Sequence, residues 1–258
     1  MQYLSVVIIT FNEEDHISNC IDSVSSVADE IIVVDCFSTD RTVEIARAKG
    51  AIVREETWRG YIEQKNLALS FAKNNYVLSL DADEMLDDRL RNSIAEAKKT
   101  FGHKAYIMNR CTSYCGKFIR HGQWYPDRKL RLFDKRVASW GGLNPHDKIV
   151  LSSQVQTVHL DGDILHYSYA SIEEHVTHGN KFSTIAAESL YARGRKPSWI
   201  NILANPLWTF IHGYIVRRGM LDGVAGFIIA IISAHHTFLK YIKLYQLWHR
   251  SGSSGYKA

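Results

Sequence analysis

The sequence predicts an α/β protein, with a doubly wound, mostly parallel sheet followed by a C-terminal α-helical appendage. Two observations predict the sheet: β-branched runs alternate with amphipathic stretches over the first hundred residues, and polar residues follow the runs. A third predicts the appendage, because the last third of the chain is apolar, aromatic and basic. With 258 residues, 46% of them hydrophobic, the chain can form a globular core, which excludes a disordered protein.

The first hundred residues contain four predicted strands and four predicted helices. Buried parallel strands favour β-branched residues, and such runs occupy positions 5–10, 30–35, 51–54 and 76–80. Apolar residues recur three or four positions apart in the expected helices, 12–27, 41–49, 62–73 and 87–99. We expect Glu84 and Asp87 to serve the N-terminus of the last of these helices.

The alternation becomes less regular after residue 100. Strands are predicted at 103–108, 111–120 and 129–133, with another inside 156–167, and a loop at 140–148. A capping box at Ser171–Glu174 predicts the start of a helix that ends near Gly194. We therefore expect one domain over residues 1–170 and a helical, basic region over 171–258.

The two regions differ in charge. Residues 1–170 carry a net charge of −2, whereas residues 171–258 carry +6. The runs 197–216 and 223–239 contain no charged residue and approach bilayer-spanning length. Because basic residues flank both ends of each run, a spanning hairpin would conflict with the positive-inside rule, and two helices at a membrane interface are favoured. A spanning hairpin and a soluble helical cap remain as alternatives.

Polar side chains follow three of the predicted strands. Ligands of open parallel sheets bind beyond the carboxyl ends of the strands, where Asp35, Asp81 and Asp83 are expected. An acid such as Asp35 can accept hydrogen bonds from a nucleotide base or ribose. The carboxylates of Asp81 and Asp83 can share a divalent cation with a diphosphate.

Four segments, taken together in this order and spacing, resemble glycosyltransferase family 2 over residues 4–150. They are Val6-Val-Ile-Ile-Thr-Phe-Asn-Glu-Glu14, Asp35-x-x-Ser-x-Asp40, Gln64-Lys-Asn66 and Leu80-Asp-Ala-Asp-Glu84. The resemblance implies a GT-A fold, a nucleotide-sugar donor, Mg²⁺ or Mn²⁺ as cofactor, and inversion at the anomeric carbon.

The same resemblance implies roles for residues near the nucleoside. Thr10 and Glu13 would contact the nucleoside, Asp35 would meet the base, and Lys65 would lie beside the base. The chain departs from the family at Cys36, where Ser is frequent, and at Lys65, where Arg is common. Neither departure removes a charge that the site needs.

The resemblance also implies that Asp81 faces the ribose or sugar and that Asp83 binds the metal. Inverting transfer further needs a base that takes the proton of the acceptor hydroxyl. Asp147 is the candidate, because family members place the base in a loop at this distance from Asp81. His146 is the rival, since imidazole can accept a proton near neutral pH.

A basic cluster of Arg128, Lys129 and Arg131 would hold the donor diphosphate or phosphates of the acceptor, unless it is a solvated edge strand. Segments 58–66, 122–133 and 144–148 resemble the bacterial lipopolysaccharide-core branch of the family, the β-1,4-glucosyltransferase type that acts on an inner-core heptose. This resemblance implies a UDP-sugar donor, glucose as the transferred hexose, and a lipid-anchored anionic glycan as the acceptor. Such an acceptor would account for a basic region at a membrane surface.

These observations predict an inverting hexosyltransferase, cytoplasmic and peripheral on the cytoplasmic face of the inner membrane. No nucleic-acid partner is expected, because the body is slightly acidic and lacks a nucleic-acid-binding motif. Two alternatives remain open. The acceptor can be another lipid-linked glycan or a polysaccharide, or the protein can be a scaffold that binds nucleotide-sugars without turnover.

Overall fold

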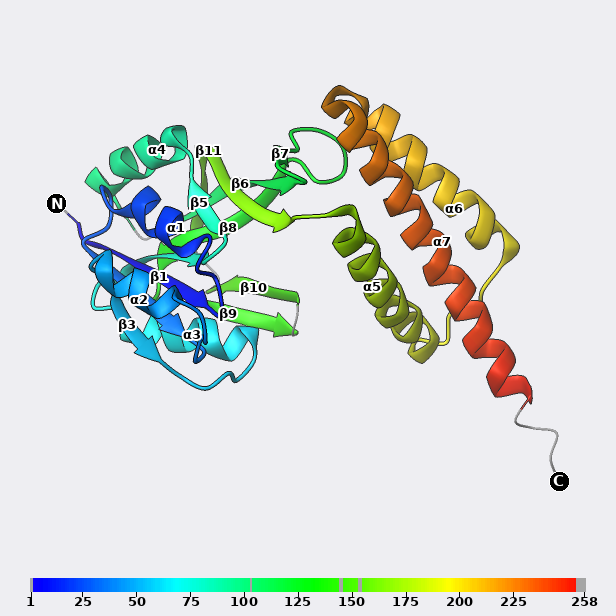
Figure 1. Cartoon of the computed structure of the whole chain (residues 1–258), viewed down its shortest axis with the longest axis horizontal. Helices are drawn as coiled ribbons and strands as arrows, with labels where there is room; N and C mark the ends of the chain where they lie inside the picture. Colours follow the sequence, from blue (N-terminus) through cyan, green and yellow to red (C-terminus); the bar gives the residue numbers. More distant parts are fainter. Residues whose placement is uncertain (1, 103, 144–145, 153–154, 254–258) are drawn as a thin grey trace. The chain divides into compact units, whose positions relative to one another are not determined.

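The computed structural model describes residues 2–102, 104–143, 146–152 and 155–253, which form two compact units (Figure 1). The first unit comprises residues 1–111 and 127–167, and the second comprises residues 112–126 and 168–258. The segment 112–126 therefore belongs with the C-terminal helices, although it lies far from them in the sequence.

The first unit is built around a mixed sheet with the strand order β3-β2-β1-β4-β8-β6-β11-β5. In that order the strands are β3 (Ile52–Glu55), β2 (Glu30–Asp35), β1 (Leu4–Thr10), β4 (Tyr76–Asp81), β8 (Asp127–Asp134), β6 (Lys104–Tyr114), β11 (Gln156–Tyr169) and β5 (Glu84–Leu86). The first four are parallel, and β8 pairs with β4 in the antiparallel sense. This arrangement confirms the predicted GT-A sheet, which its antiparallel strands extend beyond β4.

Helices cover both faces of the sheet, because apolar side chains of β1 point alternately to one face and the other and both sets are buried. They are α1 (Ile17–Val24), α2 (Thr42–Ala48), α3 (Tyr61–Phe71) and α4 (Asp88–Lys99). Leu4, Val6 and Ile8 pack into one core with residues of α1 and α4, whereas Val7 packs into the other core with residues of α3. Because successive strand residues point to opposite faces, one β-branched run supplies both cores.

Two predictions about the middle of the chain are wrong. The expected loop at 140–148 lies instead in an antiparallel hairpin of β9 (Ala138–Leu143) and β10 (His146–Leu151), stabilised by burial of Trp140. The expected break near residue 110 is absent, because β6 runs continuously through it. The chain turns later, at Cys115 and Gly116, whose positive φ angles form the turn before β7 (Lys117–Phe118).

The second unit confirms the helical appendage. It contains α5 (Ile172–Ala192), α6 (Trp199–Ile211), the π-helix η1 (His212–Val216), the 3-10 helix η2 (Gly219–Asp222) and α7 (Gly223–Ser253). The predicted capping box is confirmed, since the Ser171 hydroxyl accepts from the Glu174 N–H at 3.1 Å. Lys243 of α7 donates to Asn180 and Ser183 of α5, and Asp222 accepts from the backbone of His121, so polar contacts join the segments of this unit.

Candidate active site

A cleft of about 800 Å³ opens at the carboxyl ends of β1, β2 and β4, where the sequence places its polar residues. The side chains that line it come from these strand ends, from the start of α3 and from β11. They are Ile9, Thr10, Phe11, Glu13, Cys36, Trp58, Tyr61, Asp81, Ala82, Asp83 and His166. We call this cavity the acidic cleft.

The loops after β1 and β2 are tied together beside the acidic cleft. The N–H of Asn12 donates to Ser38 Oγ, and Asn12 Oδ1 accepts from the Thr39 N–H, both at 2.8 Å. Asn12 and Phe37 adopt positive φ angles of 53° and 60°, a conformation that non-glycine residues adopt chiefly where tertiary contacts enforce it. These contacts hold Thr10 and Glu13 in place at the cleft.

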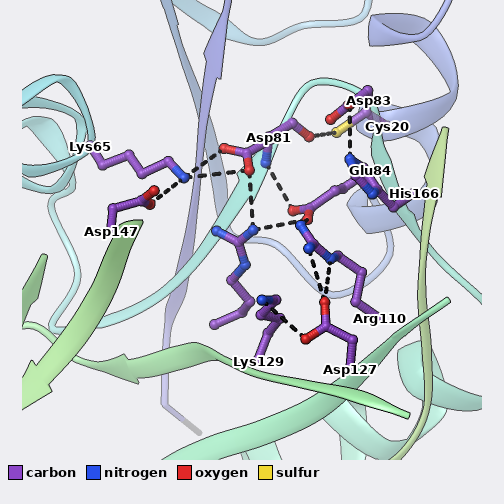
Figure 2. Close-up of polar contacts among 11 residues, drawn as sticks. Cys20, Lys65, Asp81, Asp83, Glu84, Arg110, Asp127, Lys129, Asp147 and His166 are labelled. Carbon is purple, nitrogen blue, oxygen red and sulfur yellow. Dashed lines mark hydrogen bonds and ion pairs between the residues drawn. The ribbon is translucent and has the colours of Figure 1, made fainter. Parts of the chain in front are cut away.

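The acidic centre of the cleft consists of Asp83 and Glu13, with the imidazole of His166 beside them. Asp83 Oδ2 lies 3.1 Å from His166 Nε2, a pairing drawn in Figure 2. Burial and the negative charge of Asp83 raise the pKa of Glu13 above its ordinary value, although His16 partly offsets both effects. Two neighbouring carboxylates without a nearby lysine or arginine in the lining favour a bound cation.

These side chains fit a divalent cation that is completed by its substrate. Mg²⁺ is commonly held by one or two carboxylates together with substrate phosphates, so it does not require a full cage of protein ligands. Among the described residues, no group of three His, Cys, Asp or Glu side chains forms such a cage. The carboxylate of Asp83, with the imidazole of His166 beside it, has the chemistry of such a partial site, which phosphate oxygens would complete.

Two aromatic side chains form part of the wall of the cleft. Trp58 and Tyr61 make an edge-to-face contact with ring centroids 4.8 Å apart, and each remains about half exposed. Buried Thr10 contributes a hydroxyl oxygen that has no hydrogen-bond partner. Exposed ring faces and an unpartnered hydroxyl are suited to a planar, polar group such as a nucleobase.

A second cavity, of about 510 Å³, lies on the other side of Asp81 and carries mostly positive side chains. It is lined by Lys65, Asp81, Arg110, Arg128, Lys129, Leu130, Arg131, Trp140, Asp147, Lys148 and Ile149. We call this cavity the basic pocket. Asp81 contributes to both cavities and is the structural link between them.

Asp81 is held ionised by two cations. Lys65 Nζ lies 3.1 Å from Asp81 Oδ1 and 2.8 Å from Asp147 Oδ2 (Figure 2). Arg131 Nη2 lies 3.1 Å from Asp81 Oδ2. Burial alone would raise the pKa of Asp81, but the charges of Arg131 and Lys65 hold it below its ordinary range. Lys65 therefore fixes the positions of Asp81 and Asp147 relative to each other.

Glu84 holds both Arg131 and the backbone of Asp81 in place. Its carboxylate is fully buried, lies 2.8 Å from Arg131 Nη2 and accepts from the Asp81 N–H at 3.1 Å. The expectation that Glu84 serves the N-terminus of α4 is thus wrong, because a buried arginine is the stronger partner. Asp87 does cap that helix, accepting from the Leu90 N–H at 2.7 Å.

The predicted site residues divide between the two cavities. Thr10, Glu13 and Asp83 line the acidic cleft, whereas Lys65, Arg128, Arg131 and Asp147 line the basic pocket with Asp81 between them. Asp35 is fully buried, and its carboxylate accepts from the Ser38 N–H at 2.8 Å. Its neighbour Cys36 lines the cleft. The side chain of His146 lies outside the described residues.

Several further polar or aromatic side chains of the two cavities were not singled out by the sequence, among them Trp58, Tyr61, Arg110, Trp140, Lys148 and His166. His166 reaches Asp83 because β11 pairs with β5 in a register that sets His166 opposite Glu84. No local motif marks that register, so only the paired strands reveal it. Lys148 lies in the segment 144–148, directly after the candidate base Asp147, and that position was the available sequence signal.

Comparison with known proteins gives the following matches. A family model described as glycosyl transferase family 2 matches residues 5–151. An uncharacterized glycosyltransferase of Rickettsia typhi is 35% identical over 258 residues, covering 96% of this chain and 88% of the relative. The lipopolysaccharide core biosynthesis glycosyltransferase LpsC of Rhizobium meliloti is 30% identical, covering 94% of this chain and 92% of the relative.

Solved structures give a shorter match. Glucosyl-3-phosphoglycerate synthase from Mycobacterium tuberculosis, in complex with Mn²⁺, UDP and glucosyl-3-phosphoglycerate, aligns with a TM-score of 0.37 and 26% identity. The alignment covers 43% of this chain and 44% of that one.

Proposed function

We propose, since this chain belongs to glycosyltransferase family 2, that it transfers glucose from a UDP-sugar, with inversion, to the heptose of a lipopolysaccharide inner core. That the protein is a glycosyltransferase follows from its family and relatives. The observation that carries the finer proposal is the pair of cavities on either side of Asp81. One is acidic and suited to a metal-bound diphosphate, and the other is basic and contains the candidate base.

The donor would occupy the acidic cleft. Asp83 and His166 would hold Mg²⁺ or Mn²⁺, which when bound neutralises the charge that develops on the departing diphosphate. Glu13 would add a second carboxylate beside the metal, and Trp58 would stack on the base. Asp35 would act through the Ser38 loop, because its carboxylate is engaged there.

The acceptor would approach from the basic pocket. Asp147 lies in β10 with its side chain mostly buried, and one of its oxygens pairs with Lys65. In a single displacement the acceptor hydroxyl must attack from the side opposite the leaving diphosphate. A base in the basic pocket and a diphosphate in the acidic cleft, with Asp81 between them, would meet that requirement. His146 remains the rival base.

The acceptor class is supported by LpsC, whose name assigns it to lipopolysaccharide core biosynthesis. Turnover can be tested by mixing the full chain with UDP-glucose, MnCl₂ and a truncated lipopolysaccharide core, and measuring released UDP. We expect release that depends on both metal and acceptor, and that falls at least ~100-fold in Asp83→Asn. Binding of UDP without acceptor-dependent release would favour the scaffold, and profiling UDP- and GDP-sugars would identify the donor.

We further propose that the second unit binds the cytoplasmic face of the inner membrane peripherally. On α6, a stripe of side chains at helical spacing is between 60% and 74% exposed: Trp199, Ile200, Leu203, Leu207 and Trp208. Within Gly219–Arg250, which spans η2 and α7, an 18-residue stretch has a mean hydropathy of 1.4, so this segment is long and apolar enough to cross a membrane by length and composition alone. Exposed apolar stripes close to arginines fit an anionic interface, because insertion and charge attraction act together.

Vesicle flotation tests the membrane proposal with the full chain. We expect the protein to float with phosphatidylglycerol-containing vesicles and Leu203→Gln/Leu207→Gln to float several-fold less. The control Tyr3→Gln/Ile52→Gln removes two exposed apolar side chains from the first unit and should float like wild type. If all three proteins floated equally, or if none of them floated, the apolar stripe of α6 would be excluded as the membrane contact.

A further inference from the structure

We propose that the basic pocket is a subsite for an anionic group, a phosphate or a carboxylate, carried by the glycan acceptor. Arg128, Lys148 and Arg131 would bind its oxygens. This proposal rests on the proposed glycosyl transfer, and it adds to that function a location and a chemical class for the group that the acceptor must carry.

The charge of the basic pocket is the first observation. Six cations line it, against the two carboxylates of Asp81 and Asp147. The cations are Lys65, Arg110, Arg128, Lys129, Arg131 and Lys148. Such an excess of one sign in a concave site raises the local concentration of an oppositely charged ligand.

Four of these cations already have carboxylate partners. Lys65 pairs with Asp81 and Asp147, and Arg131 with Asp81 and Glu84. Arg110 and Lys129 share Asp127, at 2.9 Å and 3.1 Å. In contrast, Arg128 and Lys148 are exposed, and neither side chain has a hydrogen bond or ion pair with another residue in the described part of the chain. The free positive charge of the pocket therefore lies on β8 and β10.

Unpartnered buried donors are the second, independent observation. The Arg131 side chain is only 4% exposed, and although Nη2 is paired, its Nε and Nη1 have no hydrogen-bond acceptor among the residues that the structure describes. Trp140 Nε1, in the wall of the same pocket, is likewise without one. A buried donor without an acceptor is destabilising, and an anionic oxygen in the pocket would relieve that cost. The planar guanidinium of arginine suits phosphate and carboxylate oxygens in particular.

The position of Asp147 assigns the anion to the acceptor rather than to the donor. The donor diphosphate belongs with the metal, and Asp83 and His166 line the acidic cleft. Asp147 lines the basic pocket together with Arg128 and Lys148. The hydroxyl that Asp147 deprotonates must therefore enter this pocket, and a cavity of about 510 Å³ has room for one sugar ring with its charged substituent.

Steady-state kinetics on the full chain test the subsite. The variant Arg128→Ala/Lys148→Ala is compared with Arg89→Ala/Lys99→Ala, which removes the same charge from exposed positions on α4. We expect the first variant to raise the KM for an anionic lipopolysaccharide-core acceptor about tenfold or more, because it removes charge-assisted hydrogen bonds to the anion. The KM for UDP-glucose should be unchanged. The control should match wild type. An unchanged acceptor KM, or a rise confined to the KM for UDP-glucose, would overturn the proposal.

Two chemically modified acceptors show whether the bound anion is a phosphate or a carboxylate. If phosphate is the anion, dephosphorylated core should raise the wild-type KM to that of the variant. If a sugar carboxylate is the anion, reduction of that carboxylate should have this effect instead. Neither treatment changing the wild-type KM would contradict an anionic subsite.

A binding measurement separates this proposal from the proposed function. Wild type saturated with UDP and Mn²⁺ is titrated with glucose 6-phosphate, glucuronate and glucose, so that the donor cleft is filled. We expect one of the two charged sugars to bind at least five-fold more tightly than glucose, and Arg128→Ala/Lys148→Ala to lose that preference. If the charged sugar binds in this way but no turnover occurs on lipopolysaccharide, the proposed anionic subsite stands and lipopolysaccharide is rejected as the acceptor. No preference for either charged sugar in wild type would reject the subsite, whatever the turnover.

Discussion

The acidic cleft and the basic pocket share Asp81, yet they shift the pKa values of their carboxyl groups in opposite directions. In the cleft, burial and Asp83 raise the pKa of Glu13, and the described residues that line the cleft include no lysine or arginine. In the pocket, Arg131 and Lys65 outweigh burial and hold the pKa of Asp81 below its usual range. The difference teaches that the cleft has unbalanced negative charge that a metal ion can neutralise, whereas the pocket has built-in cations that an anion can bind.

The largest expected effect comes from removing the base in the basic pocket. Asp147→Asn should lower turnover by at least ~100-fold, because general base catalysis typically contributes 10²–10⁴-fold. UDP affinity should be unchanged, since the donor would bind in the other cavity. Release of UDP and equilibrium binding of UDP measure the two quantities.

His146→Gln is the matched comparison for that change, and its turnover should stay within about three-fold of wild type if Asp147 is the base. The reverse pattern would assign the base to His146. Weakened UDP binding in Asp147→Asn would contradict the separation of the two cavities.

Glu84→Gln tests the support beneath Asp81. The substitution removes one of the two carboxylates that pair with buried Arg131 and leaves only Asp81, which Arg131 shares with Lys65, so we expect a loss of about 3 kcal/mol in unfolding free energy. Urea unfolding measures it. Glu96→Gln, which breaks an exposed pair with Lys99, should change stability by less than about 1 kcal/mol. Equal effects of the two substitutions would show that the buried network does not hold the pocket together.

His166→Asn tests the acidic cleft as a metal site. We expect Mn²⁺ affinity in the presence of UDP to fall on the order of ten-fold, which is typical of changes around a metal centre. Titration of Mn²⁺ into the UDP-saturated protein gives the dissociation constant. His159→Asn alters an exposed imidazole of the same strand and should bind Mn²⁺ like wild type. Matching affinities for both variants would remove His166 from the metal site.

The smallest effect concerns the pH dependence of the cleft. Because the folded-state pKa of Glu13 lies above its ordinary 4.5, the folded protein loses stability as pH rises from 4.5 toward that raised value, and the full loss is present above it. Below pH 4.5 the residue is protonated in both states, and the cost vanishes. Glu13→Gln should therefore raise the Tm by about 1–2 °C at pH 7.5 and leave it unchanged at pH 4.

Thermal unfolding with and without Mn²⁺ and UDP sharpens this test. With both ligands present, wild type should gain more in Tm than Glu13→Gln, because the carboxylate then faces a cation. A lower Tm for Glu13→Gln than for wild type at pH 7.5 without ligands would mean that burial and Asp83 do not destabilise the ionised Glu13 carboxylate.

The parts of the site that follow single strands could be predicted from the sequence. Thr10, Asp81 and Asp83 mark strand ends, and parallel strands bring those ends to one edge. The hairpin of β9 and β10 could not be predicted in the same way. Its glycines and proline resemble a loop, and only the burial of Trp140 and the pairing of Lys148 with Gly141 make it a hairpin.

By itself the sequence determined the alternating fold, the strand-end acids, the helical C-terminal region and the family. These features depend on residue type and on local spacing. Only the tertiary structure decided that Lys65 would join Asp147 to Asp81, that Glu84 would bind Arg131, and that His166 would meet Asp83. Those contacts join segments up to 83 residues apart, and they depend on strand register and shared burial, which no local pattern records.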